Sequence, residues 1–477
     1  MTDTRPNIIF IITDQQRFDT VSALGYEFVD TPNLDRLVNE GVSFTHAYCS
    51  SPSCAPSRAS LFTGYWPHTT GVLENMDTWT HSWVEDLNES GYRCVNVGKM
   101  HTMPWETPLG FHERYVVENK DRYRSDRWFV DEWDKALRVR GLEKPSRATY
   151  AELSDWEDRL GAYEWGLPEE MHPDNFVGDF ASWWLDYQPQ SQPLFMQVGF
   201  PGPHPPYDPV ERYVDQYMDR DLAIQEFDPA ELESQPSVYR ATREKMLEYN
   251  PDAVRHLANP SPEQRHRQRA YYLANVTMID EKVGEIMQSL ENNGYLDNSV
   301  VIFTSDHGDA LTDHGHSQKF TFYEPVVRVP CIVWSPSRFS GGRKCDDLIQ
   351  IMDLAPTVLE MAGLEPNQSM EAQSLMPLLN GVEGAVGREY VFSEHGRDFY
   401  VVNTDFATMV RNREWKLVRF ADHDDGILAD MIQDPGEVVN LWHDSEQADV
   451  KHRLLAVLEN WLVKSNRDSR GWQERWR

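Results

Sequence analysis

Continuous apolar runs, separated by segments with helical spacing, dominate the first three quarters of the chain. Runs rich in β-branched residues occur at 7–13, 93–97, 194–200, 299–304 and 329–334. Such runs are typical of strands that are buried on both faces of a parallel sheet. Segments with helical periodicity and helix start or stop signals lie at 31–41, 268–291 and 353–363. This alternation predicts an α/β fold built on a large, mostly parallel sheet with helices on both faces.

The pattern changes beyond about residue 380. Short strand-like segments alternate there with turns, at 390–392, 407–411 and 415–420. Short strands with turns between them predict a small antiparallel sheet. We therefore predict two domains, a large domain at 1–380 and a C-terminal α+β subdomain at 381–477.

Two acidic stretches interrupt the regular pattern, at about 104–186 and 208–262. The first is also rich in Trp and Tyr. A long irregular segment in a compact protein often covers a functional site. Its aromatic residues can equally serve plain packing, so the roles of both insertions stay open at this point.

Composition narrows the classes of function. The chain has 477 residues with 45 Lys and Arg against 77 Asp and Glu, which gives a net charge of −32. So acidic a protein is not expected to bind nucleic acid or extended polyanions. A small anionic substrate remains compatible with it, because a local cationic pocket decides that interaction.

Cysteine usage and hydropathy bear on the compartment. Five cysteines in an odd count without framework spacing predict no disulfide scaffold. The polar start of the chain lacks a basic leader and a cleavage site, and no apolar run reaches membrane-spanning length. We therefore expect no membrane segment and a cytoplasmic location. A homo-oligomer is compatible with the sequence, which does not decide the oligomeric state.

Polar side chains follow four of the predicted strands at the point where each strand ends. They are Asp14 and Gln15, Lys99 and His101, His204, and Asp306 and His307. Ligands of open α/β sheets bind beyond the carboxyl ends of the strands. Each residue alone could be a polar cap or a solvated loop, but Asp and His are also common metal ligands. Their convergence predicts one site at this edge of the sheet.

The stretch 53–64, Ser-Cys-Ala-Pro-Ser-Arg-Ala-Ser-Leu-Phe-Thr-Gly, completes this prediction. It has the pattern of an opening helical turn, in which Pro56 suits the first turn. Free backbone N–H groups at such a turn attract anions, and Arg58 lies on the same helix face as Cys54. A lone cysteine is otherwise most often a small buried apolar residue.

This stretch resembles the signature of the sulfatase family, in which the cysteine is converted to formylglycine. The resemblance extends to Lys99 with His101, to 315–324 with Lys319, and to the C-terminal motif at 434–437. It covers most of 5–110, 194–207, 265–364 and the C-terminal part, and fails across the two insertions. It implies an alkaline phosphatase-like fold with a mixed sheet, a formylglycine-generating enzyme as partner, and hydrolysis of a small sulfate ester such as an aryl sulfate or a sulfated sugar.

The resemblance also implies the roles of the site residues. The metal ligands would be Asp14, Gln15, Cys54, Asp306 and His307, and the catalytic residues Cys54, Arg58, Lys99, His101, His204 and Lys319. In the family, a hydroxyl of the hydrated formylglycine attacks sulfur. Arg58 and Lys99 would then offset charge on the sulfate oxygens, while His204 and Lys319 would face the leaving group. His101 would take the proton that lets sulfate leave.

The sequence departs from the commonest family pattern at Gln15 and His307, where many sulfatases have a second aspartate and an asparagine. An amide and an imidazole weaken the case for Ca²⁺ and improve that for Mn²⁺, although family habit still favours calcium. The related phosphonate monoester hydrolases and phosphodiesterases carry such a Gln and His pair, and are the alternative function. Against them stand Lys99 and His101, because those relatives have neutral residues there. A non-catalytic oxyanion-binding protein is the third hypothesis.

Overall fold

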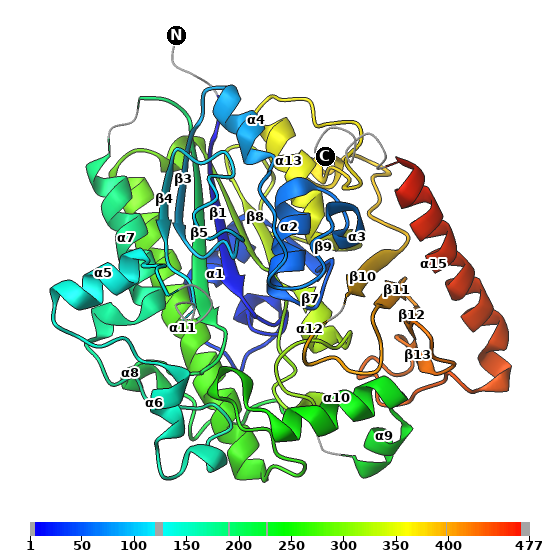
Figure 1. Ribbon diagram of the computed structural model, residues 1–477. Helices are drawn as coiled ribbons and strands as arrows, with labels where there is room; N and C mark the ends of the chain where they lie inside the picture. The colour runs from blue at the N-terminus through cyan, green and yellow to red at the C-terminus, as the bar shows by residue number, and fades with distance from the viewer. Residues whose placement is uncertain (1–4, 120–126, 189–190, 226–227, 397, 469–477) are drawn as a thin grey trace.

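The computed structural model describes residues 5–119, 127–188, 191–225, 228–396 and 398–468, and these form two sheets (Figure 1). The large sheet has nine strands in the order β4-β3-β5-β1-β6-β8-β2-β7, with β9 paired to β2. Its strands are β1 (Asn7–Asp14), β2 (Val42–Tyr48), β3 (Arg93–Gly98), β4 (Glu113–Val116), β5 (Leu194–Pro203), β6 (Ser299–Ser305), β7 (Arg328–Val329), β8 (Cys331–Trp334) and β9 (Arg343–Gln350).

The five strands from β4 to β6 in this order pair in parallel, whereas β7 and β8 run antiparallel to their neighbours. The sheet is therefore mixed and mostly parallel, which confirms the predicted fold class. All five predicted strands are present. The apolar pattern did not indicate β2, β4 and β9, because their exposed or polar positions interrupt the apolar run.

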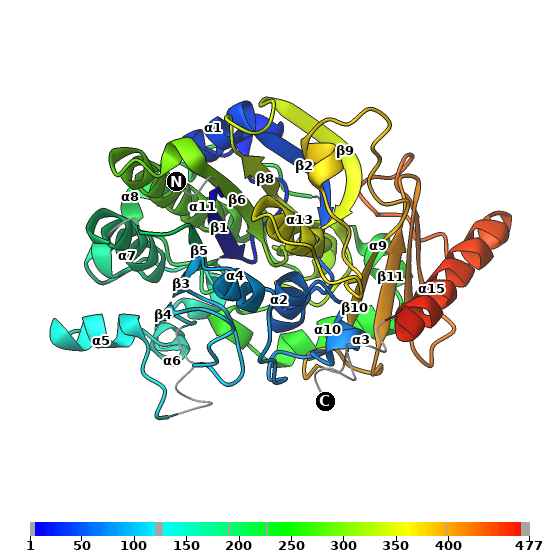
Figure 2. The ribbon, with the colours of Figure 1, turned by 90° about the horizontal axis from the view of Figure 1, so that it is seen from above.

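Helices cover both faces of the large sheet (Figure 2). On one face lie α1 (Pro32–Glu40), α7 (Pro173–Tyr187) and α11 (Pro262–Asn292), whose buried residues share an apolar cluster with alternate positions of the central strands. On the other face lie α2 (Cys54–Thr63), α4 (Val84–Glu89) and α13 (Leu354–Met361). Burial on both faces explains why the strands read as continuous apolar runs.

The two insertions fold into helices rather than irregular coverings. The first holds α5 (Glu132–Val139), α6 (Arg147–Ala151) and most of α7, and the second holds α8 (Glu211–Val214), α9 (Pro229–Ser234) and α10 (Ser237–Glu248). Buried Trp133 and Trp184 belong to the core cluster of the sheet. These aromatic residues therefore serve packing. The remaining short helices are α3 (Pro67–Thr70), α12 (Glu324–Val327) and α14 (Met376–Leu379).

The C-terminal part forms the second sheet, as expected. Four antiparallel strands follow one another in chain order, namely β10 (Val391–His395), β11 (Ala407–Arg411), β12 (Trp415–Phe420) and β13 (Gly426–Asp430). A long helix, α15 (Ala448–Asp468), packs on this sheet at the edge of the molecule (Figure 1). The sequence analysis did not predict α15. The boundary at 380 stays a prediction, since the first strand of the second sheet begins eleven residues later.

A buried group of charges joins the two sheets. Glu324, at the start of α12, accepts hydrogen bonds from Tyr48 in the large sheet (2.9 Å) and from Arg411 in the small sheet (3.1 Å). Lys416 of β12 lies 2.8 Å from the same carboxylate. Burial raises the pKa of Glu324, but Lys416 and the two arginines Arg411 and Arg328 outweigh it and hold the pKa well below its usual value.

Replacing Glu324 by glutamine is expected to destabilise the fold by about 2–3 kcal/mol, because buried Arg411 loses its counter-charge and buried Lys416 keeps only Glu437. Urea unfolding of both proteins measures the difference. Since the folded pKa is depressed, the stabilisation by Glu324 is present above the pKa of the unfolded chain and disappears as the pH falls. The difference in the free energy of unfolding between wild type and variant should therefore become smaller in acid. Exposed Glu383→Gln is the control, and an equal loss there would contradict this account.

Within the described ranges, every helix is either too short or too polar to cross a lipid bilayer.

Candidate active site

Four neighbouring parallel strands deliver polar side chains to one edge of the large sheet. The strands β3, β5, β1 and β6 lie side by side, and at their carboxyl ends stand Lys99, His204, Asp14 and Asp306 in that order. All four side chains are buried. Gly98 lets β3 end close to β5, because a Cβ atom there would lie 2.1 Å from the carbonyl oxygen of Gly199. The predicted convergence of strand ends is therefore present.

Helix α2 brings Cys54 to the same place. Cys54 is the first residue of the helix, after Ser53 in an extended conformation. The sequence analysis expected free N–H groups in the first turn. The amide of Ala55 instead donates to Oδ1 of Asn75 at 3.0 Å. Side chains rather than helix amides therefore provide most of the positive charge at this site.

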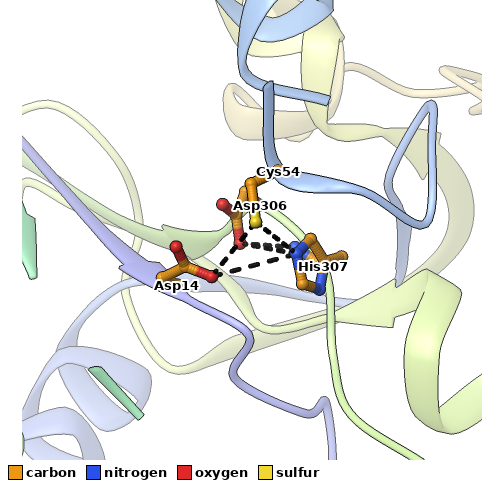
Figure 3. Close-up of side chains that lie close together, drawn as sticks. All are labelled: Asp14, Cys54, Asp306 and His307. Carbon is orange, nitrogen blue, oxygen red and sulfur yellow. Dashed lines mark hydrogen bonds and ion pairs between the residues drawn. The ribbon is translucent and has the colours of Figure 1, made fainter. Parts of the chain in front are cut away.

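Four potential metal ligands converge from β1, α2 and the end of β6 (Figure 3). Asp14, Cys54, Asp306 and His307 each offer one atom, and these atoms all lie within 4.8 Å of one another. Nε2 of His307 is 3.1 Å from the Cys54 sulfur, while Nδ1 lies 2.8 Å from the carbonyl oxygen of Gly308. Since Nδ1–H donates to that carbonyl, Nε2 faces the other three atoms. Two carboxylates, an imidazole and a sulfur are a donor set that fits a divalent metal ion.

Gln15 lies beside this group. Its side-chain Nε2 donates to Asp309 at 2.6 Å, and its Oε1 accepts from Lys319 at 3.3 Å. Tyr207 also donates to Asp309, at 2.7 Å. Asp309 thus fixes the amide of Gln15 so that its oxygen faces the site, which is the orientation that a metal ligand needs.

Lys319 links the sulfur to His204. Its Nζ lies 3.0 Å from the Cys54 sulfur and donates to Nε2 of His204 at 3.0 Å. Nδ1 of His204 lies 2.8 Å from the carbonyl oxygen of Pro205, which accounts for this orientation of the ring. Burial and Lys319 keep the pKa of His204 well below its usual value, so its imidazole is neutral.

Lys99 and Arg58 complete the cationic lining. Lys99 forms a close ion pair with Asp14 and donates to Asn119. Arg58 donates from Nε to Asp306 at 2.7 Å and from Nη1 to the carbonyl oxygen of Lys99 at 3.0 Å. Its Nη2 is buried, has no hydrogen-bond partner among the described residues, and lies 3.9 Å from Asp14. A buried guanidinium nitrogen of this kind is ready to donate to an anion.

The charges in the site act on the thiol. Burial and Asp14 raise the pKa of Cys54, but the positive charges of Lys319, His307 and Lys99 outweigh them, so its pKa lies below the usual value. The same surroundings affect Asp14, because burial raises its pKa while Lys99 and other cations hold it well below the usual range. The pocket as a whole therefore favours negative charge.

His101 is buried two residues beyond Lys99 and is held by other contacts. Its backbone N–H donates to Glu118 at 2.8 Å, and its ring stacks on Trp105 with centroids 6.0 Å apart. Its backbone is left-handed, with φ of 59°. The role of His101 in proton transfer stays a prediction, as do the roles of the other candidate residues.

Sequence reasoning missed two residues that orient the site and a third, His395, that lies buried near it. Asn119, just after β4, contacts both Lys99 (2.5 Å) and Nδ1 of His204 (3.0 Å). Asp309 orients Gln15, as described above. His395, at the end of β10, is 2% exposed and packs against Phe320 with ring centroids 5.6 Å apart. The position of Asn119 after a strand was a usable signal, whereas only the tertiary structure brings His395 here.

Comparison with known protein families shows to which of them this chain is related. The family model described as Sulfatase matches residues 6–364, three quarters of the chain. The chain belongs to the sulfatase family. A second model, described as N-sulphoglucosamine sulphohydrolase, C-terminal, matches residues 312–464 of this sulfatase-family chain. The suspected family, and with it an enzyme of the sulfuric ester hydrolase class, is thereby confirmed.

Two relatives illustrate the breadth of the family. An arylsulfatase of Clostridium perfringens is 29% identical over 472 residues, which cover 95% of this chain and 94% of that protein. An N-acetylglucosamine-6-O-sulfatase of Bacteroides thetaiotaomicron is 26% identical, covering 95% of this chain and 86% of that protein.

Solved structures share the fold. The phosphonate monoester hydrolase of Agrobacterium radiobacter superposes with a TM-score of 0.79 at 24% identity, covering 97% of this chain and 96% of that chain. A structure solved in complex with D-glucosamine-2-N,6-O-disulfate gives a TM-score of 0.74 at 24% identity, covering 97% and 98% of the two chains. At this level of identity, both establish the alkaline phosphatase-like fold alone.

Proposed function

We propose that the protein hydrolyses a sulfate monoester of an aromatic or sugar alcohol, with formylglycine made from Cys54 as the nucleophile and one divalent metal ion. One observation carries the proposal: the four converging donor atoms, of which the Cys54 sulfur is one, lie beside the cations of Arg58, Lys99 and Lys319. Relatives named as an arylsulfatase and a sugar sulfatase, similar over nearly the whole chain, support the same substrate class. We further propose that residues 1–380 form the catalytic domain and 381–477 a subdomain of it.

The metal ligands would be Asp14, Gln15, Asp306 and His307, together with the modified residue 54. We place Ca²⁺ first by family habit, and Mn²⁺ second because of the amide and imidazole donors. When bound, such an ion lowers the pKa of a coordinated oxygen and offsets the charge of the reacting group. Elemental analysis of the purified protein identifies the bound ion.

The side chains of the chain itself bind and orient the ester. Arg58 offers its Nη2, which has no partner in the described part of the chain, and Lys99 its ammonium to the sulfate oxygens, where negative charge accumulates. His204 and Lys319 lie together on the leaving-group side, so that Lys319 can stabilise the departing alcohol oxygen. His101 would accept the proton released when sulfate leaves. The formylglycine supplies a second hydroxyl, which allows the covalent intermediate to break down.

Asp309→Asn should weaken the apparent affinity for the divalent ion by about 10–100-fold, since it disturbs the residue that orients Gln15. Metal titration of protein stripped with a chelator measures this, with thermal unfolding as a readout that does not need turnover. Tyr207→Phe removes one of the same hydrogen bonds to Asp309 and should cause a smaller shift. An unchanged metal affinity in Asp309→Asn would argue against this arrangement.

The decisive experiment measures sulfate release by protein produced together with a formylglycine-generating enzyme. Phenyl sulfate, 4-nitrophenyl sulfate and glucosamine 6-O-sulfate are the test substrates, and an aryl phosphonate monoester is the comparison. Faster turnover of a sulfate than of the phosphonate supports the proposal. A preference for the phosphonate would overturn it.

The phosphonate monoester hydrolase function remains the second candidate because of Gln15 and His307, the pair that the sequence analysis found typical of those enzymes. A neighbour of that name also superposes well on this fold. Against it stands Lys99 in a close ion pair with Asp14, since the phosphonate monoester hydrolases have a neutral residue at this position, as the sequence analysis noted. A thiol left intact at Cys54, despite the modifying enzyme, would instead favour a non-catalytic oxyanion-binding protein.

A further inference from the structure

The loop that carries Lys319, between β6 and α12, contains several non-glycine residues in the left-handed region. Positive φ values between 46° and 77° occur at Leu311, Thr312, His314, Gln318 and Phe320. Residues other than glycine rarely adopt this backbone conformation, and it persists where surrounding contacts hold it in place. The conformation of this loop therefore depends on its neighbours in the fold.

The loop is closed at its base, next to the reacting group. The amide of Ala310 donates to the carbonyl oxygen of Gln318 at 2.7 Å. Lys319 is the following residue, and its Nζ lies 3.0 Å from the Cys54 sulfur. Because residues 310–318 form one closed loop, a change in its conformation moves the backbone from which Lys319 extends.

The second insertion holds this loop from outside. Glu231 of α9 accepts a hydrogen bond from Nδ1 of His314 at 2.5 Å. The same ring stacks on Tyr323, with centroids 3.7 Å apart and an angle of 7° between the planes. Gln235, which directly follows α9, donates to the carbonyl oxygen of His314 at 2.8 Å. Its side-chain oxygen lies 3.2 Å from Nε2 of His316. These contacts fix the ring and the backbone of a left-handed residue together.

Other contacts hold the remaining parts of the loop. Asp313 accepts from Arg17 at 2.7 Å and from Arg269 at 3.0 Å. The amide of Phe320 donates to the carbonyl oxygen of Pro52 at 3.2 Å. The insertion thus adds its contacts in the middle of the loop, between two anchored ends.

Glu231 and Gln235 are themselves buried, with exposed fractions of 5% and 2%. A buried polar group that loses its partner cannot easily recover the hydrogen bond from water. Removal of either side chain therefore leaves His314 with an unsatisfied group, and the left-handed backbone loses a contact that holds it.

We propose that Glu231 and Gln235 are positioning residues for Lys319, which act through His314 on the closed loop 310–318. The inference rests on the proposed sulfatase function, in which Lys319 stabilises the departing alcohol oxygen. The second insertion thereby contributes to S–O bond cleavage without touching the substrate. Both residues lie in a part of the chain where the resemblance to the family signature fails, so this arrangement is a property of this chain.

The dependence of kcat/KM on the leaving group tests the proposal, in protein produced with a formylglycine-generating enzyme. Phenolate is a stronger base than 4-nitrophenolate, so cleavage of phenyl sulfate depends more on a cation at the departing oxygen. In Glu231→Gln, kcat/KM should fall by about 10–100-fold for phenyl sulfate and by less than about threefold for 4-nitrophenyl sulfate. Gln235→Met removes the donor to the His314 carbonyl and should show the same selectivity. Equal losses for both substrates, or no loss, would overturn the positioning role.

A second measurement uses Lys319→Ala as the background. Because Glu231 acts through Lys319, adding Glu231→Gln to that variant should lower kcat/KM for phenyl sulfate by less than about twofold. Additive losses would instead mean general damage to the fold, and would reject the proposal.

Glu233→Gln is the matched control, because Glu233 lies on the same helix and is exposed. It should match the wild type with both substrates. If the modified wild type releases sulfate but the variants lack the expected selectivity, the positioning role fails while the sulfatase function stands. If the modified wild type hydrolyses no sulfate ester, both fail.

Discussion

Cys54→Ala is expected to lower kcat/KM by about 10⁴-fold or more, because removal of a nucleophile leaves only binding and charge stabilisation. The thermal stability should change little, since alanine fits at a buried helix start. Sulfate release from 4-nitrophenyl sulfate measures the effect. The thiol occupies the point where Asp14, His307 and Lys319 converge, so its loss removes the reacting group from an otherwise intact pocket.

Cys49→Ala provides the control, because Cys49 is also buried and lies only five residues away. Burial raises the pKa of the Cys49 thiol, which keeps it protonated and unreactive. We expect Cys49→Ala to keep nearly full activity. Comparable losses in both variants would mean that Cys54 contributes packing alone.

A mass measurement completes this experiment independently of turnover. Trypsin releases the peptide 37–58, which contains both Cys49 and Cys54. In protein produced with a formylglycine-generating enzyme, residue 54 should have the mass of an aldehyde and react with a hydrazide, while Cys49 is alkylated as a thiol. Alkylation of both cysteines would contradict the proposed modification.

Arg58→Lys is expected to lower kcat/KM by about 10²–10³-fold. This is the usual effect of removing one preorganised hydrogen-bond donor to a developing negative charge. Lysine keeps the charge and can still pair with Asp306, but it cannot also reach the Lys99 carbonyl and donate a third hydrogen bond. The loss should appear mainly in kcat, because the sulfate oxygens gain charge in the transition state. Steady-state kinetics at a fixed metal concentration separates kcat from KM.

Arg411→Lys is the matched control for this substitution. Arg411 is likewise buried and paired with a carboxylate, Glu324 at 3.1 Å, but it lies between the two sheets and not in the site. The Arg411→Lys variant should be less stable than wild type by about 1–3 kcal/mol, while kcat of the folded protein stays unchanged. If Arg58→Lys behaves like Arg411→Lys, Arg58 has a structural role only.

Much of the fold could be read from the chain. Strands β1, β3, β5, β6 and β8 are buried on both faces, and this leaves a continuous apolar run that local sequence reveals. Helix α15 was missed, although four of its residues are buried. Its polar faces obscure the apolar spacing, and its stability depends on packing against the second sheet.

The sequence by itself determined the chemistry of the strand ends and the motif around Cys54, because residue types and local spacing are properties of the chain. Only the tertiary structure decided which of these residues meet. The order β3-β5-β1-β6 joins residues nearly 300 positions apart, and Asn119 and Asp309 gain their roles from the neighbours that this order brings to them.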